Sequence, residues 1–374
     1  MRIVICGDIV PTNSNITLFE SGNIEELFGQ DILTCFQEAD LRIVNLETPF
    51  SDTNQRIDKS GPSLCAPLRS GYALKELDIS LASLANNHIF DAGEEGLIDT
   101  IEMLDQMKIR HVGAGLCYEE IVKPIIFKDD EMAVGIYSCC EHEFSVNEEK
   151  KIGANPVDLL KSFEAVKTLR AQVDYVIVLY HGGREQYRYP TPNQQRIMRC
   201  FVDSGASLVV AQHSHCIGCE ENYNDGKIIY GQGNFIFDRI QNEYWNSGLI
   251  ICCDISKERV DITYTPVESI GNGRVREAKD KSYDAIMHGF NQRSHALIED
   301  KQLVEREFAD LCERNVQRYI RLLRGDRFID KVLTKIIGNK YVHMLYRGER
   351  ARRAYALISC ETHHEILLRI LKNL

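Results

Sequence analysis

The sequence lacks several features that would place it in a special class at once. It contains no run of eighteen or more apolar residues, so no membrane-spanning helix is expected. A strand-like segment begins at Arg2, which leaves no room for a signal peptide, and we expect a cytoplasmic protein. We find no internal repeat and no low-complexity tract. The composition, 44% hydrophobic and 26% charged, is typical of a globular protein.

A disulfide framework is not indicated either, although the chain has 13 cysteines. Their number is odd and they are scattered. Several lie inside apolar runs, where a free thiol behaves as a small buried hydrophobic group. Cys216 and Cys219 have the spacing of a zinc or redox motif, but either interpretation would need a second pair or a thioredoxin-like context. We therefore favour loop packing for these two residues.

The charge is negative overall and uneven along the chain. The net charge is −11, yet residues 281–374 hold 18 Lys and Arg against 12 Asp and Glu. Residues 1–280 hold 26 against 43, and such an acidic body argues against nucleic acid as a partner. The basic tail suits an acidic partner or membrane surface, although solvated helix faces explain it more simply.

Strand-like and helix-like segments alternate up to about residue 215. The helix-like segments have apolar residues spaced for one helical face and cover residues 24–39, 94–107, 157–171 and 193–203. This alternation predicts an α/β fold with a largely parallel sheet covered by helices. Residues 123–128 and 132–140 predict a hairpin. Strands that follow closely at 227–230, 249–255 and 260–265 predict antiparallel closure of the sheet.

The composition changes around residues 271–273, after which helical spacing dominates. We therefore predict a main domain of residues 1–270 and an α-helical C-terminal extension of residues 271–374. The first helix of the extension is indicated by an apolar stripe. Its members are Val304, Phe308, Leu311, Cys312, Val316, Tyr319, Ile320 and Leu323.

Polar residues able to bind a metal follow the strand-like runs of the main domain. The most informative case is His213-Ser214-His215, which follows a small, apolar run at residues 206–212. An H-x-H pair alone arises by chance. Its weight comes from the other strand ends, because ligands of open α/β sheets bind beyond the carboxyl ends of the strands. The residues at these ends that we take as one candidate site are Asp8, Glu47, Asn87, His88, His181, His213 and His215.

This set has the chemistry of a metal centre. Carboxylates, an amide oxygen and imidazoles suit Mn, Fe or Zn. Two ions that share one carboxylate would need about this many ligands, and such a pair can activate a water and bind a tetrahedral phosphorus. One histidine left uncoordinated could donate a proton to the leaving oxygen. We therefore expect a divalent metal cofactor, as one or two ions.

The order and spacing of six motifs resemble the CapA branch of the calcineurin-like metallophosphoesterase superfamily, which is named for capsule and poly-γ-glutamate synthesis. The resemblance covers roughly residues 1–270 and implies a layered β-sheet core flanked by helices. The motifs are Gly7-Asp8, Asn45-Leu46-Glu47-Thr48, Leu84-Ala85-Asn86-Asn87-His88, His181-Gly182-Gly183-Arg184-Glu185, His213-Ser214-His215 and Gly233-Asn234-Phe235.

The resemblance also implies roles for these residues. Asp8 and His215 would bind the first metal, and His181 and His213 the second. Glu47 takes the place of the bridging carboxylate. Asn87 matches a ligand, and His88 matches the catalytic histidine.

Two positions depart from the superfamily pattern. Val10 stands where the first motif usually has a histidine, and Glu47 replaces the usual aspartate. The CapA branch generally shares both features. They leave the first metal with one ligand fewer.

Further residues of the motifs are candidates for substrate contact. They are Asn45, Asn86, Arg184, Glu185 and Asn234. A plainer interpretation stays open for each. The asparagines could simply form turns at strand ends, and Arg184 could pair with Glu185.

Two functions stay open. The first is a metal-dependent hydrolase-like protein of capsule or poly-γ-glutamate-type polymer biosynthesis, with metal-hydroxide attack and His88 as general acid. Its substrate would be an anionic polymer or a phosphoester. The alternative is a non-catalytic, metal-binding assembly factor for a membrane-bound polymer synthase, which Val10 and the lack of a membrane anchor favour. The oligomeric state is not predicted.

Overall fold

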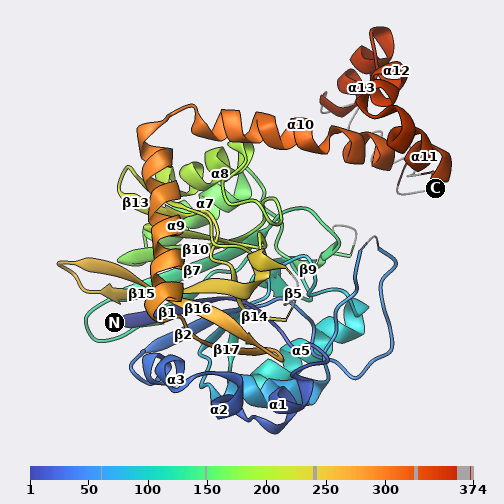
Figure 1. Ribbon diagram of the computed structural model, residues 1–374. Helices are drawn as coiled ribbons and strands as arrows, with labels where there is room; N and C mark the ends of the chain where they lie inside the picture. Colours follow the sequence, from blue (N-terminus) through green and yellow to red (C-terminus); the bar gives the residue numbers. More distant parts are fainter. Residues whose placement is uncertain (60, 148–149, 239–241, 324–326, 360–370, 372–374) are drawn as a thin grey trace. The chain divides into compact units, whose positions relative to one another are not determined.

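The computed structural model describes all residues except 60, 148–149, 239–241, 324–326, 360–370 and 372–374 (Figure 1). The chain divides into two compact units, Met1–Val304 and Glu305–Leu374. All strands found among the described residues belong to the first unit. None of the helices within the described ranges combines the length and hydropathy that a membrane span needs.

The larger sheet of the first unit has the strand order β17-β16-β15-β1-β2-β3-β4, and β14 pairs with the end of β1. Strands β1 to β4 and β14 are parallel, whereas β15, β16 and β17 pair antiparallel. The bounds are β1 (Arg2–Val10), β2 (Leu41–Leu46), β3 (Leu81–Ser83), β4 (Arg110–Val112), β14 (Asn234–Phe237), β15 (Ser247–Ile255), β16 (Val260–Gly271) and β17 (Arg274–Glu277).

The second sheet has the order β12-β13-β11-β10-β7-β6, with four parallel strands in the centre and an antiparallel strand at each edge. Its bounds are β6 (Ile125–Lys128), β7 (Ala133–Cys140), β10 (Tyr175–His181), β11 (Leu208–Gln212), β12 (Glu220–Tyr223) and β13 (Gly226–Ile229). A small third sheet joins β5 (Ala114–Gly115), β9 (Ile152–Ala154) and β8 (Val146–Asn147).

The two large sheets pack face to face because their strands are apolar on both sides. Along β1, Ile3 and Ile5 lie in the cluster between the sheets, while Val4 and Cys6 lie in the cluster beneath the helices. Strand β10 alternates in the same way, with Ile177 turned toward the first sheet. Successive side chains point to opposite faces of a strand. A strand without a polar face must therefore be covered on both sides.

Helices cover the two outer faces of this sandwich (Figure 1). On the first sheet lie α1 (Ile16–Ser21), α2 (Ile24–Leu27), α3 (Gln30–Gln37), α4 (Gly71–Glu76) and α5 (Gly93–Gln106). On the second lie α7 (Lys161–Arg170) and α8 (Pro192–Asp203), whereas α9 (Asp280–Glu299) contacts β12 of the second sheet and β16 of the first. The short elements α6 (Tyr118–Ile121), η1 (Leu68–Ser70) and η2 (Glu243–Asn246) lie in connections. The predicted layered α/β core flanked by helices is confirmed.

The helix predicted over residues 24–39 is broken in the structure. Between α2 and α3, Phe28 is extended and its ring stacks on that of Phe235, with 4.9 Å between the ring centres. The backbone N–H of Gly29 donates to the carbonyl of Val275, 3.0 Å away on β17. The chain therefore leaves the helical path to join the core and the edge strand. The periodic pattern did not indicate this tertiary contact.

The unit that contains the sheets continues beyond residue 270, where the sequence predicts a boundary. Strand β17 follows that point, and helix α9 buries Phe290 and Leu297. The Ser294 hydroxyl accepts a hydrogen bond of 2.9 Å from the N–H of Glu220 on β12. These contacts make α9 part of the first unit.

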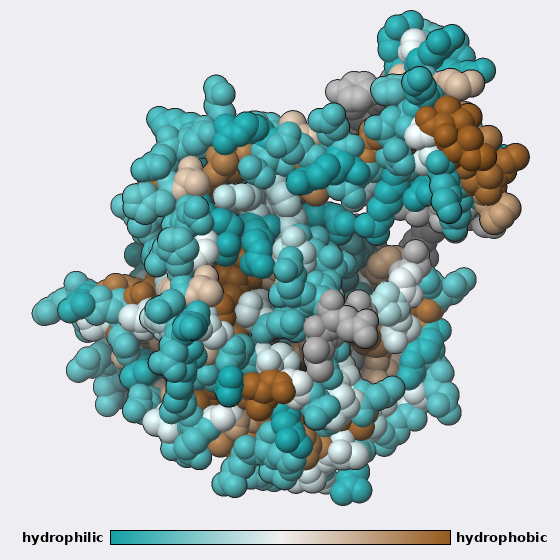
Figure 2. Space-filling view, in the orientation of Figure 1, coloured by the Kyte–Doolittle hydropathy of each residue, from teal (hydrophilic) through white to brown (hydrophobic). Residues whose placement is uncertain are grey.

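In its described residues, the second unit consists of helices and the short connections between them. It contains most of α10 (Leu303–Leu323), followed by α11 (Phe328–Ile337), α12 (Asn339–Leu345) and α13 (Glu349–Ser359). Figure 2 shows hydrophobic side chains gathered on the surface of this unit. Among the most exposed are Phe328, Ile336 and Met344. Exposed apolar patches of this kind are typical of interaction surfaces.

Substitution of Gly7 tests the junction of β1 and β14, which carries Asp8. A Cβ atom there would meet the carbonyl oxygen of Gly233, which is backbone and cannot turn away. We expect Gly7→Ala to lower the free energy of unfolding by about 2–3 kcal/mol. Gly289→Ala on α9 is the control, because its Cβ meets only the flexible end of Arg293. We expect that variant to gain about 0.5–1 kcal/mol in urea unfolding. Equal stability of both variants would contradict the packing described.

Candidate metal centre

The predicted metal-binding residues come together at one edge of the sandwich, where carboxyl ends of central strands of both sheets meet. From the first sheet, Asp8 lies near the end of β1 and Glu47 follows β2. From the second, His181 ends β10 while His213 and His215 follow β11. All five side chains are buried. They form two groups of potential metal donors, and Glu47 belongs to both.

The first group contains Asp8, Glu47 and His215. The Nδ1 atom of His215 lies 3.3 Å from Asp8 Oδ2 and 3.9 Å from Glu47 Oε2. One donor atom from each residue lies within 4.8 Å of the others. These spacings fit donors around a single cation.

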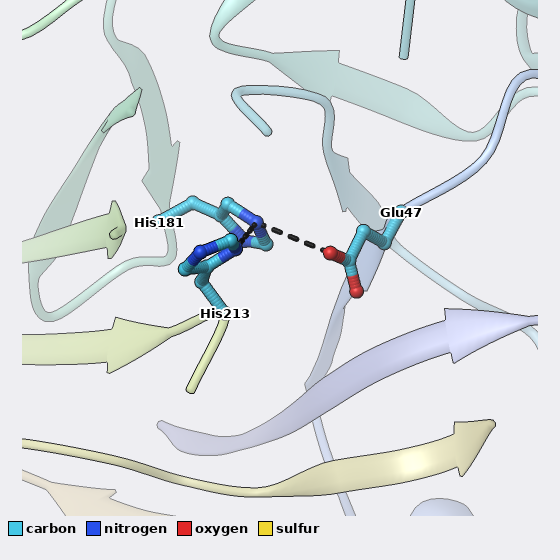
Figure 3. A group of neighbouring side chains, drawn as sticks. All are labelled: Glu47, His181 and His213. Atoms are coloured by element: carbon cyan, nitrogen blue, oxygen red, sulfur yellow. Dashed lines mark hydrogen bonds and ion pairs between the residues drawn. The ribbon is translucent and has the colours of Figure 1, made fainter. Parts of the chain in front are cut away.

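The second group contains Glu47, His181 and His213 (Figure 3). The Nε2 atom of His181 lies 3.3 Å from Glu47 Oε1 and 3.1 Å from His213 Nδ1. The side-chain oxygen of Asn87 lies 3.0 Å from the same Nε2. The structure thus places His181 and His213, the predicted ligands of the second metal, together with Glu47 and with Asn87. The two carboxylate oxygens of Glu47 belong to different groups.

The loop after β11 places His213 and His215, which are separated by one residue, in the site by means of an unusual backbone conformation. His213 has φ 88° and His215 has φ 52°, both in the left-handed region that non-glycine residues rarely adopt. Such residues cost of order 1–3 kcal/mol each and persist only where the surroundings hold them. The buried histidine rings pack edge-on or tilted against each other. Such strain is common at functional sites.

The electrostatics of the site fit a cation. Within the described residues, Asp8 Oδ2 and both carboxylate oxygens of Glu47 are buried and accept no hydrogen bond. Burial, together with the neighbouring Asp8 carboxylate, raises the pKa of Glu47 well above its usual value. Burial and the adjacent histidines lower the pKa values of His181 and His213, which favours the neutral imidazole that binds metals. Buried carboxylates without hydrogen bonds are costly unless a positive charge compensates them.

His88, the predicted catalytic histidine, lies outside both donor groups, in the turn after β3. Its Nδ1 lies 2.6 Å from Asp91 Oδ2, so the carboxylate accepts the Nδ1–H and orients the ring. Asp91 also accepts a hydrogen bond of 2.7 Å from the backbone N–H of Leu64. With Nδ1 occupied in this way, Nε2 is the atom free to carry or release a proton.

Lys59 is a member of this arrangement that the sequence did not reveal. It lies in the irregular segment between β2 and η1 and is almost fully buried. Its ammonium forms an ion pair with Asp91 and lies 3.1 Å from His88 Nδ1. It also lies 4.9 Å from the ring centre of Phe144. No motif or periodicity marks this lysine, because its partners come from other segments.

Two of the predicted substrate-contact residues instead form hydrogen bonds with residues of the site. The amide nitrogen of Asn45 lies 2.7 Å from Asp8 Oδ1 and 3.2 Å from His181 Nδ1. The side-chain oxygen of Asn86 accepts hydrogen bonds from the N–H groups of His88 and Ile89, as in a turn former. Both asparagines are fully buried. We interpret them as positioning residues.

The other predicted substrate contacts lie in different surroundings. Arg184 is half-buried and Glu185 is exposed, on the segment after β10. The negative charge of Glu185 contributes to the raised pKa of Glu47. Asn234, the first residue of β14, is buried beside His215. Trp245 was not predicted, yet its ring stacks on His215 with 3.9 Å between ring centres.

The family of the chain follows from its sequence. A family model described as the bacterial capsule synthesis protein PGA_cap matches residues 2–239. The chain belongs to this family, and the family predicted from the six motifs is confirmed.

Two proteins from Bacillus are similar to this chain in sequence. The capsule biosynthesis protein CapA of Bacillus anthracis is 30% identical over 52% of this chain and 49% of its own length. The PGA biosynthesis protein CapA of Bacillus subtilis is 26% identical over 65% of each chain. A probable polyglutamine synthesis accessory protein of Mycobacterium tuberculosis is 25% identical over 53% of this chain and 56% of its own length. The chain therefore spans about half to two thirds of these relatives.

Solved structures with a similar fold are more distant. A phosphatase from Mycoplasma pneumoniae covers 72% of this chain and 95% of its own, with 13% identity and a TM-score of 0.46. A 5′-nucleotidase precursor from Thermus thermophilus covers 80% and 60%, with 13% identity and a TM-score of 0.42. Likenesses at this level do not bear on the activity.

Removal of the Lys59 ammonium tests the buried ion pair behind His88. We expect Lys59→Met to lower the free energy of unfolding by about 3 kcal/mol, because Asp91 keeps a buried charge without its cation. Lys150→Met is the control, since Lys150 pairs with Glu94 at the exposed surface. Its loss should cost less than about 1 kcal/mol. Chemical denaturation measures both, and similar small losses would contradict the burial assigned to Lys59.

Proposed function

We propose that this chain is a metal-dependent, hydrolase-like protein that acts in the biosynthesis of a capsule or poly-γ-glutamate-type polymer. The observation that carries the proposal is the pair of buried donor groups that share Glu47, with His88 oriented beside them by Asp91. Family membership and the names of the relatives support the polymer class.

The donor residues would hold two divalent cations. Asp8, Glu47 and His215 would bind the first, and Glu47, His181, His213 and Asn87 the second. Mn, Fe and Zn suit these oxygen and imidazole donors. When bound, such a pair supplies Lewis acidity at a phosphoryl or carbonyl oxygen and activates water.

His88 would act as the general acid that donates a proton to the leaving group. Asp91 accepts the Nδ1–H, which fixes the tautomer and leaves Nε2 as the atom that can exchange a proton with the substrate. Lys59 balances the charge of Asp91, so the carboxylate remains an acceptor for His88. The small exposed fraction of the His88 side chain, 11%, leaves it access to a substrate.

The charges around the site bear on the substrate class. The carboxylates of Glu143 and Glu185 both contribute to the raised pKa of Glu47, so the surroundings of the donor groups are acidic. An anionic polymer or a phosphoester would therefore need the bound cations as its principal positive contact. A substrate is therefore favoured in which the group that reacts carries the negative charge, because that group would contact the bound cations.

The second candidate is a non-catalytic, metal-binding assembly factor for a membrane-bound polymer synthase. Val10 in the first motif favours it, because the first cation lacks a histidine donor there. The name of the mycobacterial relative, a probable polyglutamine synthesis accessory protein, points the same way.

Metal content tests the donor assignment. We expect His181→Ala and His213→Ala to retain less Mn²⁺ than the unchanged protein after loading and desalting, because each removes an imidazole donor from the second group. His288→Ala is the matched control, since His288 is exposed on α9. Elemental analysis measures all four proteins. The same metal content in each of them would refute the assignment.

Turnover separates the enzyme from the assembly factor. With Mn²⁺ supplied, the protein should hydrolyse members of a phosphoester and γ-glutamyl substrate panel. His88→Ala should reduce that rate by about 10²-fold or more while the metal content persists, since general acid catalysis contributes about that much. A panel without any turnover in the metal-loaded protein would instead support the assembly factor.

A further inference from the structure

The first donor group has an incomplete set of predicted ligands. Val10 occupies the position where the first motif usually provides a histidine. In the structure, Val10 packs with Phe237 and Trp245 in a small apolar cluster. Val10 therefore offers no donor to the first group, and a fourth protein ligand would come from another residue.

Asn234 lies where such a donor is needed. It begins β14, which pairs in parallel with β1, and Asn234 is the register partner of Asp8. The residue is buried, and its side-chain oxygen lies 2.9 Å from Nδ1 of His215. Tight packing of Gly248 against the backbone of Asn234 fixes its position, because a Cβ atom on Gly248 would overlap the Asn234 carbonyl.

The two donor groups repeat one arrangement. In the second group, the amide oxygen of Asn87 lies 3.0 Å from the His181 nitrogen that faces Glu47. In the first, the amide oxygen of Asn234 lies 2.9 Å from the His215 nitrogen that faces Asp8 and Glu47. Asn234 thus occupies the same position relative to the histidine of the first group as Asn87 does relative to His181 of the second.

We propose that the amide oxygen of Asn234 is the fourth protein ligand of the first cation and takes the place of the missing histidine. The inference rests on the proposed function, because it requires a metal at this site. It assigns Asn234 a different role from the substrate contact expected from the sequence.

A simple orienting role for Asn234 fits the geometry less well. The Nδ1 atom of His215 faces both carboxylates, and a nitrogen that binds a cation carries no proton. Without that proton it cannot donate to Asn234. Two acceptor atoms 2.9 Å apart then repel each other unless a positive charge lies between them. The stacked ring of Trp245 fixes the plane of the His215 ring.

Counting bound ions tests the proposal. The full chain, stripped with chelator, is titrated with Mn²⁺, and the bound ions are counted by elemental analysis and by the paramagnetic resonance of free Mn²⁺. We expect two ions in the unchanged protein and one in Asn234→Leu. Asn87→Leu should also retain one. Asn222→Leu, at an exposed position of β12, should retain two. Asn234→Asp should retain two, because a carboxylate oxygen replaces the amide oxygen.

The outcomes separate the inference from the proposed function. Two ions in Asn234→Leu with unchanged affinity, or a single ion in the unchanged protein, would overturn the role of Asn234 and leave a metal-dependent function in place. No ion in the unchanged protein would overturn both.

A crystal structure of the Mn²⁺-loaded, unchanged chain tests the ligand directly and does not depend on the folding of a variant. We expect the Asn234 side-chain oxygen within about 2.2 Å of the first ion, the usual distance for an oxygen ligand. An ion bound instead through Nε2 of His215, with Asn234 outside its coordination shell, would overturn the proposal.

Discussion

The Glu47 carboxylate is the constraint on which the site depends. It is fully buried, its two oxygens belong to different donor groups, and neither accepts a hydrogen bond within the described residues. A buried carboxylate in this state is costly unless a positive charge compensates it. Each donor group also combines residues of both sheets. Bound cations would therefore join the two halves of the sandwich at the edge where the apolar layer between the sheets ends.

A layer of supporting residues surrounds the donors and explains why the site can be strained and still ordered. Asn45 contacts Asp8 and His181, and Asn86 holds the turn that carries His88. Asp91 orients His88, and Lys59 neutralises Asp91. Such second-layer contacts set the orientation of metal ligands and of catalytic rings. The left-handed backbone of His213 and His215 is held in the same way, by packing around the rings.

Much of this arrangement follows from local sequence. Apolar runs that end in Gly, Asn, Asp or His indicate buried strands and place their polar ends at one edge, which is why a helix-covered α/β sheet and the candidate donors could be predicted. The layered core was expected from the family resemblance. The rest depends on contacts between distant segments. The break in the helix at Phe28 depends on the contact with Phe235, and α9 joins the first unit through its contact with β12. The role of Lys59 depends on its ion pair with Asp91. The position of Asn234 follows from its pairing with Asp8, which no local pattern records.

The stacking of Trp245 on His215 gives the protein a built-in optical reporter. Trp245 is the chain's single tryptophan, so emission excited near the red edge of its absorption comes from this one indole. A change in the charge of the imidazole against which it stacks would alter the quenching of that emission. Occupancy of the first donor group could thus be followed in solution, without any attached dye and separately from the second group.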